Sequence, residues 1–177
     1  MAKTYPAIGP FTAGDILTAA TMTDVQTNLT NQRVPTMASV YRSAALSHTS
    51  NGAYQSIAWD TEAFTQTDTG MWSAGTNPSR VTLTTAGLYV VTATVSPGAS
   101  ATGFRIPSIY KNGAAAAFGD TTPGNATINY CNVSALIQSD GTNYVEIFVY
   151  QNSGGNIAYT VGAAAMQCSV AWLGQAS

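Results

Sequence analysis

The chain has 177 residues, of which 45% are hydrophobic and 10% aromatic, while only 8% are charged. The length suits one domain, and this hydrophobic content excludes a disordered chain. A net charge of −2 argues against binding to a phosphate backbone, and no stretch approaches the ~18 apolar residues of a membrane-spanning helix. Soluble domains usually carry about 25% charged residues. A surface of Thr, Ser, Asn, Gly and Ala often contacts other protein, so we expect an oligomer or a part of a larger assembly.

The N-terminal stretch Met1–Asp15 lacks the apolar core of a signal peptide and is interrupted by proline and glycine. A protein that stays in a reducing cytosol keeps its cysteines as thiols. Cys131 and Cys168 both fall on the apolar phase of alternating segments, which suits buried free thiols. A disulfide between them would require the two segments to be neighbouring strands.

The first 36 residues contain an extended stretch rich in proline and glycine, followed by a helical pattern. Within Thr18–Asn31 the apolar residues Met22, Val25 and Leu29 recur at i, i+3 and i+7. A helix of about four turns with so thin an apolar stripe is marginal alone in water. It must therefore pack on its own domain or on a neighbour.

The two ends of this helix also carry signals. Thr21 followed by Asp24 resembles a capping arrangement with a carboxylate in the first turn, where the helix dipole favours a negative charge. Arg33-Val34-Pro35 is expected to end the helix, because the residue before a proline avoids the α region.

After this segment, residues 37–177 show alternating hydrophobicity. Val145, Ile147 and Val149, for example, share one phase of a strand pattern. Turn signals separate the runs at roughly ten-residue spacing, and Asn112-Gly113 is the strongest hairpin signal among them. The pattern predicts an all-β sandwich or barrel.

The stretch Thr67–Val95 resembles the core signature of the complement C1q/tumour-necrosis-factor jelly-roll family. It has a Thr-Gly pair, an aromatic residue two positions on, and a later Gly-x-Tyr that leads into a long strand. Ile57–Asp60 resembles the family's upstream strand, Ile109–Gly113 its K-N-G hairpin and Ser169–Gly174 its closing strand. The resemblance covers about 140 residues and implies a ten-strand antiparallel jelly roll that assembles as a trimer.

The run Phe11–Ala20 is similar to the "aGdiLTAa" opening common in short phage head and tail proteins. This resemblance implies a bacteriophage virion component, made in the host cytoplasm without a signal peptide and released by lysis. Residues 1–36 would then be an arm and helix that anchor the jelly roll of residues 37–177 to other virion proteins. The expected anchoring side chains are Phe11, Ile16, Leu17, Met22, Val25 and Leu29.

His48 is the single histidine and lies in a turn-rich stretch. A Ser/His/Asp triad could use it with Asp60 or Asp68 as the orienting group. No Gly-x-Ser-x-Gly elbow is present, however, and an ordinary loop histidine is the favoured interpretation. One histidine and two distant cysteines do not make a tetrahedral zinc site.

Asp60 and Glu62 lie two residues apart on a predicted strand, so that both carboxylates point to one face. Such a pair could serve a glycosidase or form half of a calcium site. We favour a plainer interpretation, in which a strand ends in solvated carboxylates. Asp120 and Asp140 are expected to be turn residues. The sequence thus predicts no catalytic residue, no metal site and no cofactor.

Tyrosine is abundant, and several tyrosines alternate with apolar residues on predicted strands. Exposed aromatic rings can form a sugar-binding platform, or they can pack between subunits of an oligomer. We favour packing, and expect a trimer interface at Tyr144, Phe148 and Tyr150.

Two functions remain open. The favoured one is a non-enzymatic structural virion protein, a trimeric knob on the capsid (decoration or head fibre) or a minor tail protein. The alternative is a tail receptor-binding module that recognises a host-surface glycan or protein through loops such as Ser96–Gly103 and Phe118–Asn125. These loops hold few aromatic or charged residues, which favours the structural role. No group of residues supports an enzyme.

Overall fold

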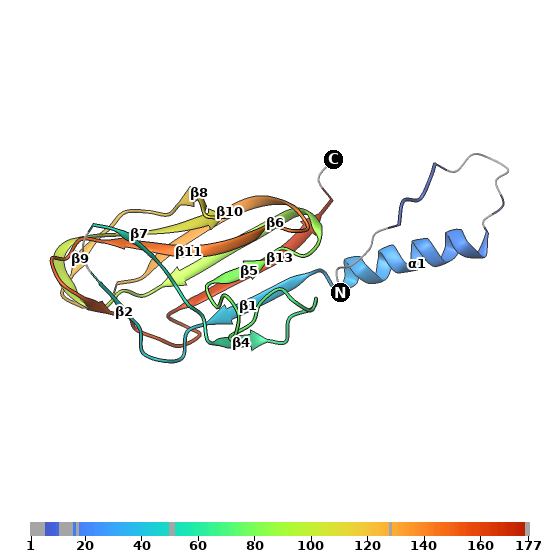
Figure 1. The fold of residues 1–177 in the computed structure, drawn as a ribbon. Helices are drawn as coiled ribbons and strands as arrows, with labels where there is room; N and C mark the ends of the chain where they lie inside the picture. Colours follow the sequence, from blue (N-terminus) through green and yellow to red (C-terminus); the bar gives the residue numbers. More distant parts are fainter. Residues whose placement is uncertain (1–5, 11–15, 17, 50–51, 128, 176–177) are drawn as a thin grey trace.

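A computed structural model describes residues 6–10, 16, 18–49, 52–127 and 129–175, and shows an all-β sandwich with one helix on its N-terminal side (Figure 1). The elements are α1 (Ala19–Arg33), β1 (Met37–Tyr41), β2 (Ser47–His48), β3 (Tyr54–Ser56), β4 (Thr61–Phe64), β5 (Arg80–Thr82), β6 (Ala86–Val95), β7 (Ser100–Lys111), β8 (Ala114–Phe118), β9 (Thr122–Asn125), β10 (Cys131–Asp140), β11 (Tyr144–Gln151), β12 (Ile157–Ala158) and β13 (Gln167–Gly174).

The strands form two antiparallel sheets that face each other. One sheet has the order β10-β6-β13-β1-β4, and the other has the order β3-β11-β7-β8, with β5 pairing with β11 and β9 with β7. β12 and β2 form a separate short pair. The predicted antiparallel sandwich is therefore confirmed. The described residues form thirteen strands where ten were expected, and four of these, β2, β3, β5 and β12, have only two or three residues.

The apolar side chains that alternate along the sequence form the core between the two sheets. On β6 the side chains of Tyr89, Val91 and Val95 are buried, while Thr92 between them is exposed. On β11 the apolar phase faces inward in the same way. Every second residue of the long strands thus contributes to one core, as expected for strands buried on one face.

The helix α1 forms where the sequence predicts it, but it is capped differently. Thr18 is the N-cap, and its hydroxyl oxygen accepts a hydrogen bond from the Thr21 amide at 3.2 Å. No acidic residue lies in the first turn, so the expected capping by Thr21 and Asp24 is wrong. At the other end of the helix, the backbone amide of Val34 donates a hydrogen bond to the Thr30 carbonyl. The helix therefore ends directly before Pro35, as predicted.

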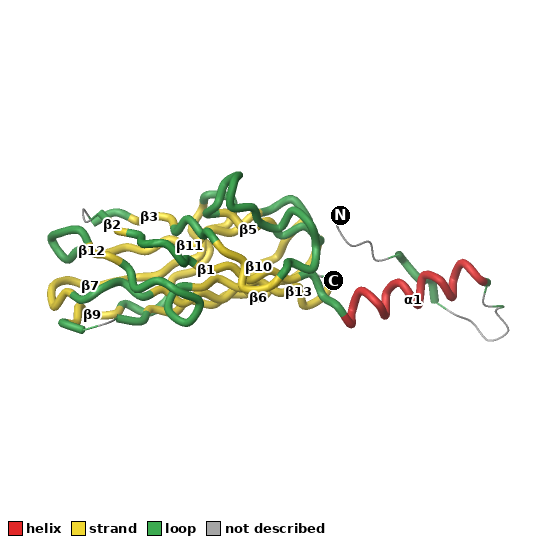
Figure 2. Tube along the Cα trace, turned by 90° about the horizontal axis from the view of Figure 1, so that it is seen from below, coloured by secondary structure: helices red, strands yellow, loops and turns green. Residues whose placement is uncertain are grey.

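Both views show α1 extending away from one end of the sandwich, roughly along its long direction (Figures 1 and 2). Pro35 and Thr36 already belong to the sandwich by their contacts. The Thr67 hydroxyl donates to the Pro35 carbonyl at 2.7 Å, and the Trp172 amide donates to the Thr36 carbonyl at 2.8 Å. The division of the chain between residues 36 and 37 remains a prediction. Because of these contacts, a truncation that removes the N-terminal segment should keep Pro35 and Thr36.

The turn between β7 and β8 is the hairpin predicted at Asn112-Gly113. The two residues have φ values of +50° and +81°, the left-handed conformation that a two-residue hairpin turn requires. The Asn112 side-chain oxygen also accepts the Tyr144 amide at 3.0 Å, which ties the turn to the start of β11.

The Gly-x-Tyr motif of the sequence lies at the start of β6. Gly87 has φ +137°, and a Cβ atom there would lie 2.3 Å from the Gly174 carbonyl oxygen and 2.4 Å from Trp172 Nε1. The buried Tyr89 hydroxyl accepts the Thr85 amide at 3.0 Å. The glycine thus makes room for the end of β13, and the tyrosine fixes the turn that precedes β6.

Candidate functional site

A cluster of aromatic rings covers part of the outer face of the β3-β11-β7-β8 sheet. The ring centroids of Tyr110 and Phe148 are 4.2 Å apart, and those of Tyr54 and Tyr150 are 5.3 Å apart. The second separation is typical of favourable aromatic pairs, and the first is slightly shorter. The six members of this cluster, which we call the aromatic face, are Tyr54, Phe104, Tyr110, Phe118, Phe148 and Tyr150.

Two of the three predicted interface residues, Phe148 and Tyr150, belong to the aromatic face. The third, Tyr144, lies farther along β11, where the guanidinium carbon of Arg80 stands 4.2 Å from the centre of its ring. Arg80 Nε is also 3.7 Å from Glu146 Oε1. All three predicted side chains therefore point to one face of β11 and are half-buried in the single chain.

Four members of the aromatic face were not predicted: Tyr54, Phe104, Tyr110 and Phe118. They come from β3, β7 and β8, and only the strand register brings them beside β11, pairing Tyr150 with Tyr54 and Phe148 with Ser108 and Ser56. Burial and the neighbouring hydroxyls of Tyr110 and Tyr150 raise the pKa of Tyr54 above its usual value. The Tyr54 phenol in this face is therefore neutral at pH 7.

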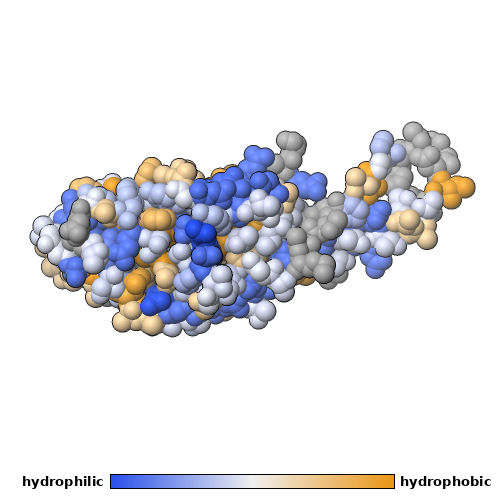
Figure 3. All heavy atoms as spheres, in the orientation of Figure 1, coloured by the Kyte–Doolittle hydropathy of each residue, from blue (hydrophilic) through white to orange (hydrophobic). Residues whose placement is uncertain are grey.

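The helix bears the second candidate surface. Of the predicted anchoring residues, Ile16 is 88% exposed, Met22 51% and Leu29 57%, and Val25 is half-buried. Strongly hydrophobic atoms are visible at the far end of the α1 segment, beside polar ones (Figure 3). Phe11 and Leu17 lie outside the described residues. The sandwich leaves Ile16, Met22 and Leu29 uncovered.

His48 is a buried core residue, and its interpretation as a loop histidine is wrong. It lies on β2 with 1% of its surface exposed, and its Nδ1 atom is 2.9 Å from the Tyr159 hydroxyl. Burial lowers its pKa below the usual value, so the ring is neutral at pH 7. Asp60 and Asp68, the proposed triad partners, bond instead to Ser43 and Thr84. This geometry offers no accessible general base at His48.

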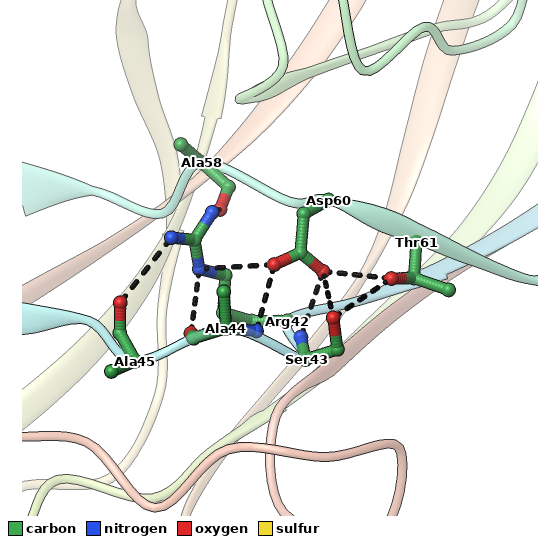
Figure 4. A network of polar contacts seen from close by, with 7 residues as sticks. All are labelled: Arg42, Ser43, Ala44, Ala45, Ala58, Asp60 and Thr61. Carbon is green, nitrogen blue, oxygen red and sulfur yellow. Dashed lines mark hydrogen bonds and ion pairs between the residues drawn. The ribbon is translucent and has the colours of Figure 1, made fainter.

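Asp60 is an internal anchor of the fold, and the interpretation as a solvated strand end is wrong for it. It lies just before β4, and its carboxylate accepts hydrogen bonds from the Ser43 and Ala44 amides at 2.7 and 2.8 Å and from the Thr61 hydroxyl (Figure 4). Arg42 Nε lies 3.4 Å from the same carboxylate. Asp60 therefore holds the chain after β1 in place.

Glu62 does not share this network. Its carboxylate accepts a hydrogen bond from Gln66 Nε2 at 2.7 Å, and the same amide group donates to the Trp72 carbonyl. The two carboxylates thus bind different segments: Asp60 binds the chain after β1, and Glu62 binds Gln66 after β4. Among the described residues, no group of three or more His, Cys, Asp or Glu side chains is placed to hold a metal ion.

The network around Asp60 predicts a pH-dependent stability. Burial raises its pKa, but the bonds from Ser43, Ala44 and Thr61 outweigh this effect and lower the pKa from 3.8 to about 2. A carboxylate with a depressed pKa stabilises the fold above its unfolded pKa, and that contribution is lost as the pH falls from about 4 to 2. We expect Asp60→Asn to lower the free energy of unfolding at pH 7 by about 2 kcal/mol.

Urea unfolding at pH 7 and at pH 2 tests this prediction. The difference between the wild type and Asp60→Asn should shrink at pH 2, where the wild-type carboxyl is largely protonated. The exposed turn residue Asp120, changed to Asn, is the control and should leave the stability unchanged at both pH values. A difference of the same size at both pH values would contradict a role for the carboxylate charge.

Both cysteines are buried free thiols, and no disulfide joins them. Burial raises the pKa of Cys131 above its usual value and that of Cys168 to about 12, so neither is a reactive thiolate at neutral pH. Within the described part of the chain, α1 is too short and too polar to cross a membrane.

No protein-family model matches the chain, and no curated protein sequence matches it. Solved structures do. Eiger TNF from S. frugiperda has a TM-score of 0.61 at 10% identity, over 81% of this chain and 96% of that one. Murine APRIL at pH 5.0 has a TM-score of 0.58 at 9% identity, over 78% and 99%. The globular domain of zebrafish complement 1qA has a TM-score of 0.54 at 9% identity, over 80% and 99%. At such identities these likenesses show the fold alone, which is a jelly-roll sandwich of the TNF/C1q type.

Proposed function

We propose that this chain is a non-enzymatic structural protein of a bacteriophage virion, a trimeric knob attached through its N-terminal arm and helix to the capsid or tail. One observation carries the attachment: α1 leaves the end of the sandwich with Met22 and Leu29 more than half exposed. Full burial of a large apolar side chain contributes roughly 1.5–3 kcal/mol. A partner that covers this segment would therefore gain binding energy that the isolated chain does not use.

The similarity of Phe11–Ala20 to the opening of phage head and tail proteins supports a virion as the site of attachment. The TNF/C1q-type fold supports the role of the sandwich as a stable, non-catalytic module. A buried, neutral His48 and buried thiols agree with the absence of a catalytic role.

The trimer is proposed from the family resemblance and from the aromatic face. Phe148 and Tyr150 are half-buried within one chain and lie among four further rings. Covering such a face with the same domain of a neighbour would remove the remaining ring surface from water. Tyr144, paired with Arg80, would lie at the margin of that contact.

Removing the N-terminal segment is expected to uncouple folding from attachment. The truncation should end at residue 34, because Pro35 and Thr36 bond to the sandwich. We expect the truncated protein to stay folded and trimeric but to be missing from purified particles, as measured by circular dichroism, light scattering and immunoblots of particles made with the variant.

The outcomes of this truncation are distinct. Normal incorporation of the truncated protein into particles would contradict the anchor. Loss of folding would instead make α1 part of the folding unit. Immunogold labelling of intact particles would then locate the protein on the head or on the tail.

A receptor-binding role on the tail is the second candidate, and one feature favours it. A surface hollow of about 550 Å³ lies beside the turn after β8, where Phe118 and Asp120 form one wall. Most of the remaining lining consists of hydroxyl and amide side chains of β6, β10 and β13, and their neutral donors and acceptors would suit a saccharide. Its lining includes Thr92, Thr94, Asn132, Ser134, Gln167 and Ser169. Binding of host-surface glycans on an array, lost in Asn132→Ala, would support this role.

A further inference from the structure

Three buried polar side chains lie together at the pole opposite α1, where β2, β9 and β12 are found (Figure 2). His48 on β2 has its Nδ1 atom 2.9 Å from the Tyr159 hydroxyl, and the two rings are stacked. Arg105 on β7 is fully buried, and its guanidinium donates to the carbonyls of Thr102 at 3.0 Å and Ser100 at 3.3 Å. The charge of Arg105 acts on the His48 ring, so we call His48, Tyr159 and Arg105 the polar cluster.

The described residues place no carboxylate against the polar cluster. Arg105 Nε is buried without a hydrogen-bond partner, and the groups whose charge acts on Arg105 are the Cys131 thiol and the Tyr159 phenol. Burial raises the pKa of both groups, so they are neutral at pH 7 and below. A second positive charge beside this guanidinium would be unfavourable, because the protein interior screens charges poorly.

The polar cluster also holds the segment Ser96–Gly103, which runs from the end of β6 into β7. Tyr159 pairs with Pro97 in an antiparallel bridge, and Arg105 binds two carbonyls of the same segment. β2 carries His48 and β12 leads into Tyr159, but these strands pair over only two residues each. Regions held by so few backbone bonds open more readily than a packed core. A change at His48 can therefore reach the segment through Tyr159.

We propose that the polar cluster is an acid-sensitive switch, in which protonation of His48 releases β2, β12 and the segment Ser96–Gly103 while the rest of the two large sheets stays folded. Protonation would place a second positive charge beside Arg105 in a buried site, and opening the pole would expose both charges to water. The switch lies within one chain and does not depend on the proposed trimer or on attachment to a particle.

The pole is expected to open on the acid side of pH 6.5. Burial lowers the pKa of His48 below its ordinary value of 6.5, a backbone bond to Ala53 opposes this effect, and Arg105 adds to it. A histidine with a lowered pKa stabilises the closed pole above pH 6.5, and this contribution is lost as the pH falls further. Asp60, with a pKa of about 2, keeps its charge at pH 5 and does not contribute in this range.

A titration of the untagged protein tests the switch. His48 is the only histidine, so its ring gives a single NMR signal that can be followed from pH 8 to pH 4. Hydrogen exchange measured by mass spectrometry at pH 7 and pH 5, corrected for the intrinsic exchange rate, shows which segments open. We expect peptides that cover β2 and β12 to exchange on the order of tenfold faster at pH 5, while peptides from β6 and β13 keep their protection.

Two variants separate the charge of His48 from its hydrogen bond. His48→Gln keeps a polar group beside Tyr159 but cannot become charged, so exchange at the pole should no longer depend on pH. Tyr159→Phe is the matched control, because it removes the bond and keeps the histidine, and its faster exchange at pH 5 should persist.

The wild type alone is able to overturn the switch, even if His48→Gln does not fold. Titration of His48 at its ordinary pKa without a change in exchange would show that its charge is tolerated in the closed pole. Equal loss of protection in β6 and β13 would mean that acid unfolds the whole sandwich. An acid effect that persists in a folded His48→Gln would assign the opening to another group.

Discussion

Replacing Phe148 by aspartate is expected to separate the proposed trimer into monomers. Phe148 belongs to the aromatic face, with its ring centroid 4.2 Å from that of Tyr110. A carboxylate at this position would be buried between subunits without a counter-charge, which costs several kcal/mol for each copy. The single chain should still fold, because the side chain is only half-buried there and lies outside the core. Light scattering across a dilution series measures the change.

Phe64→Asp is the matched control for this experiment. Phe64 lies on β4 of the opposite sheet and is 43% exposed, so the same substitution adds the same charge away from the aromatic face. We expect this variant to remain a trimer. A trimeric Phe148→Asp with unchanged circular dichroism would place the interface elsewhere and would overturn the assignment of Tyr144 and Tyr150 as well.

Replacing Gly87 by alanine is expected to be strongly destabilising. The new methyl group would lie 2.3 Å from the Gly174 carbonyl oxygen and 2.4 Å from Trp172 Nε1, so the end of β13 would have to move. The indole also donates to the Ala86 carbonyl at 3.0 Å, a bond that this movement would break. A side chain at φ +137° adds backbone strain of about 1–3 kcal/mol. We expect a total loss of about 3 kcal/mol or more in urea unfolding.

The control for Gly87 is Gly162, which has φ +114° but has no atom within 4 Å of the position that a Cβ would take. Gly162→Ala therefore carries the backbone strain without the collision and should cost less than Gly87→Ala. Equal losses for the two variants would contradict close packing against β13 as the main reason for the glycine.

The fold was largely predictable, because its signals are local. Alternation of apolar residues predicted the long strands, and Asn112-Gly113 predicted the hairpin, since its turn needs two residues in the left-handed conformation. The helix cap was predicted wrongly, because Thr18 and Thr21 both precede the apolar stripe and each is able to cap a helix. Very short strands such as β2 and β12 carry no pattern of their own and exist through their pairing.

The candidate sites were less predictable, because they depend on contacts between distant segments. Asp60 and Arg42 are 18 residues apart, and nothing in the spacing marks them as partners. His48 is buried by Tyr159, which is 111 residues away. The aromatic face was recognised on β11 alone, since its other rings reach it only through the register of β3 and β7.

The described ends of the chain lie at the same pole of the sandwich, where α1 and the end of β13 are found (Figure 1). β2, β9 and β12 lie at the opposite pole (Figure 2). If the chain attaches through α1 as proposed, a tag fused to the C-terminus would lie at the same end as the attachment and crowd it. The exposed turn at Gly154-Gly155, next to β12, has open space around it and would carry an inserted peptide outward. The C-terminus and the turn at Gly154-Gly155 therefore differ as positions for an added peptide, because they lie at opposite poles of the sandwich.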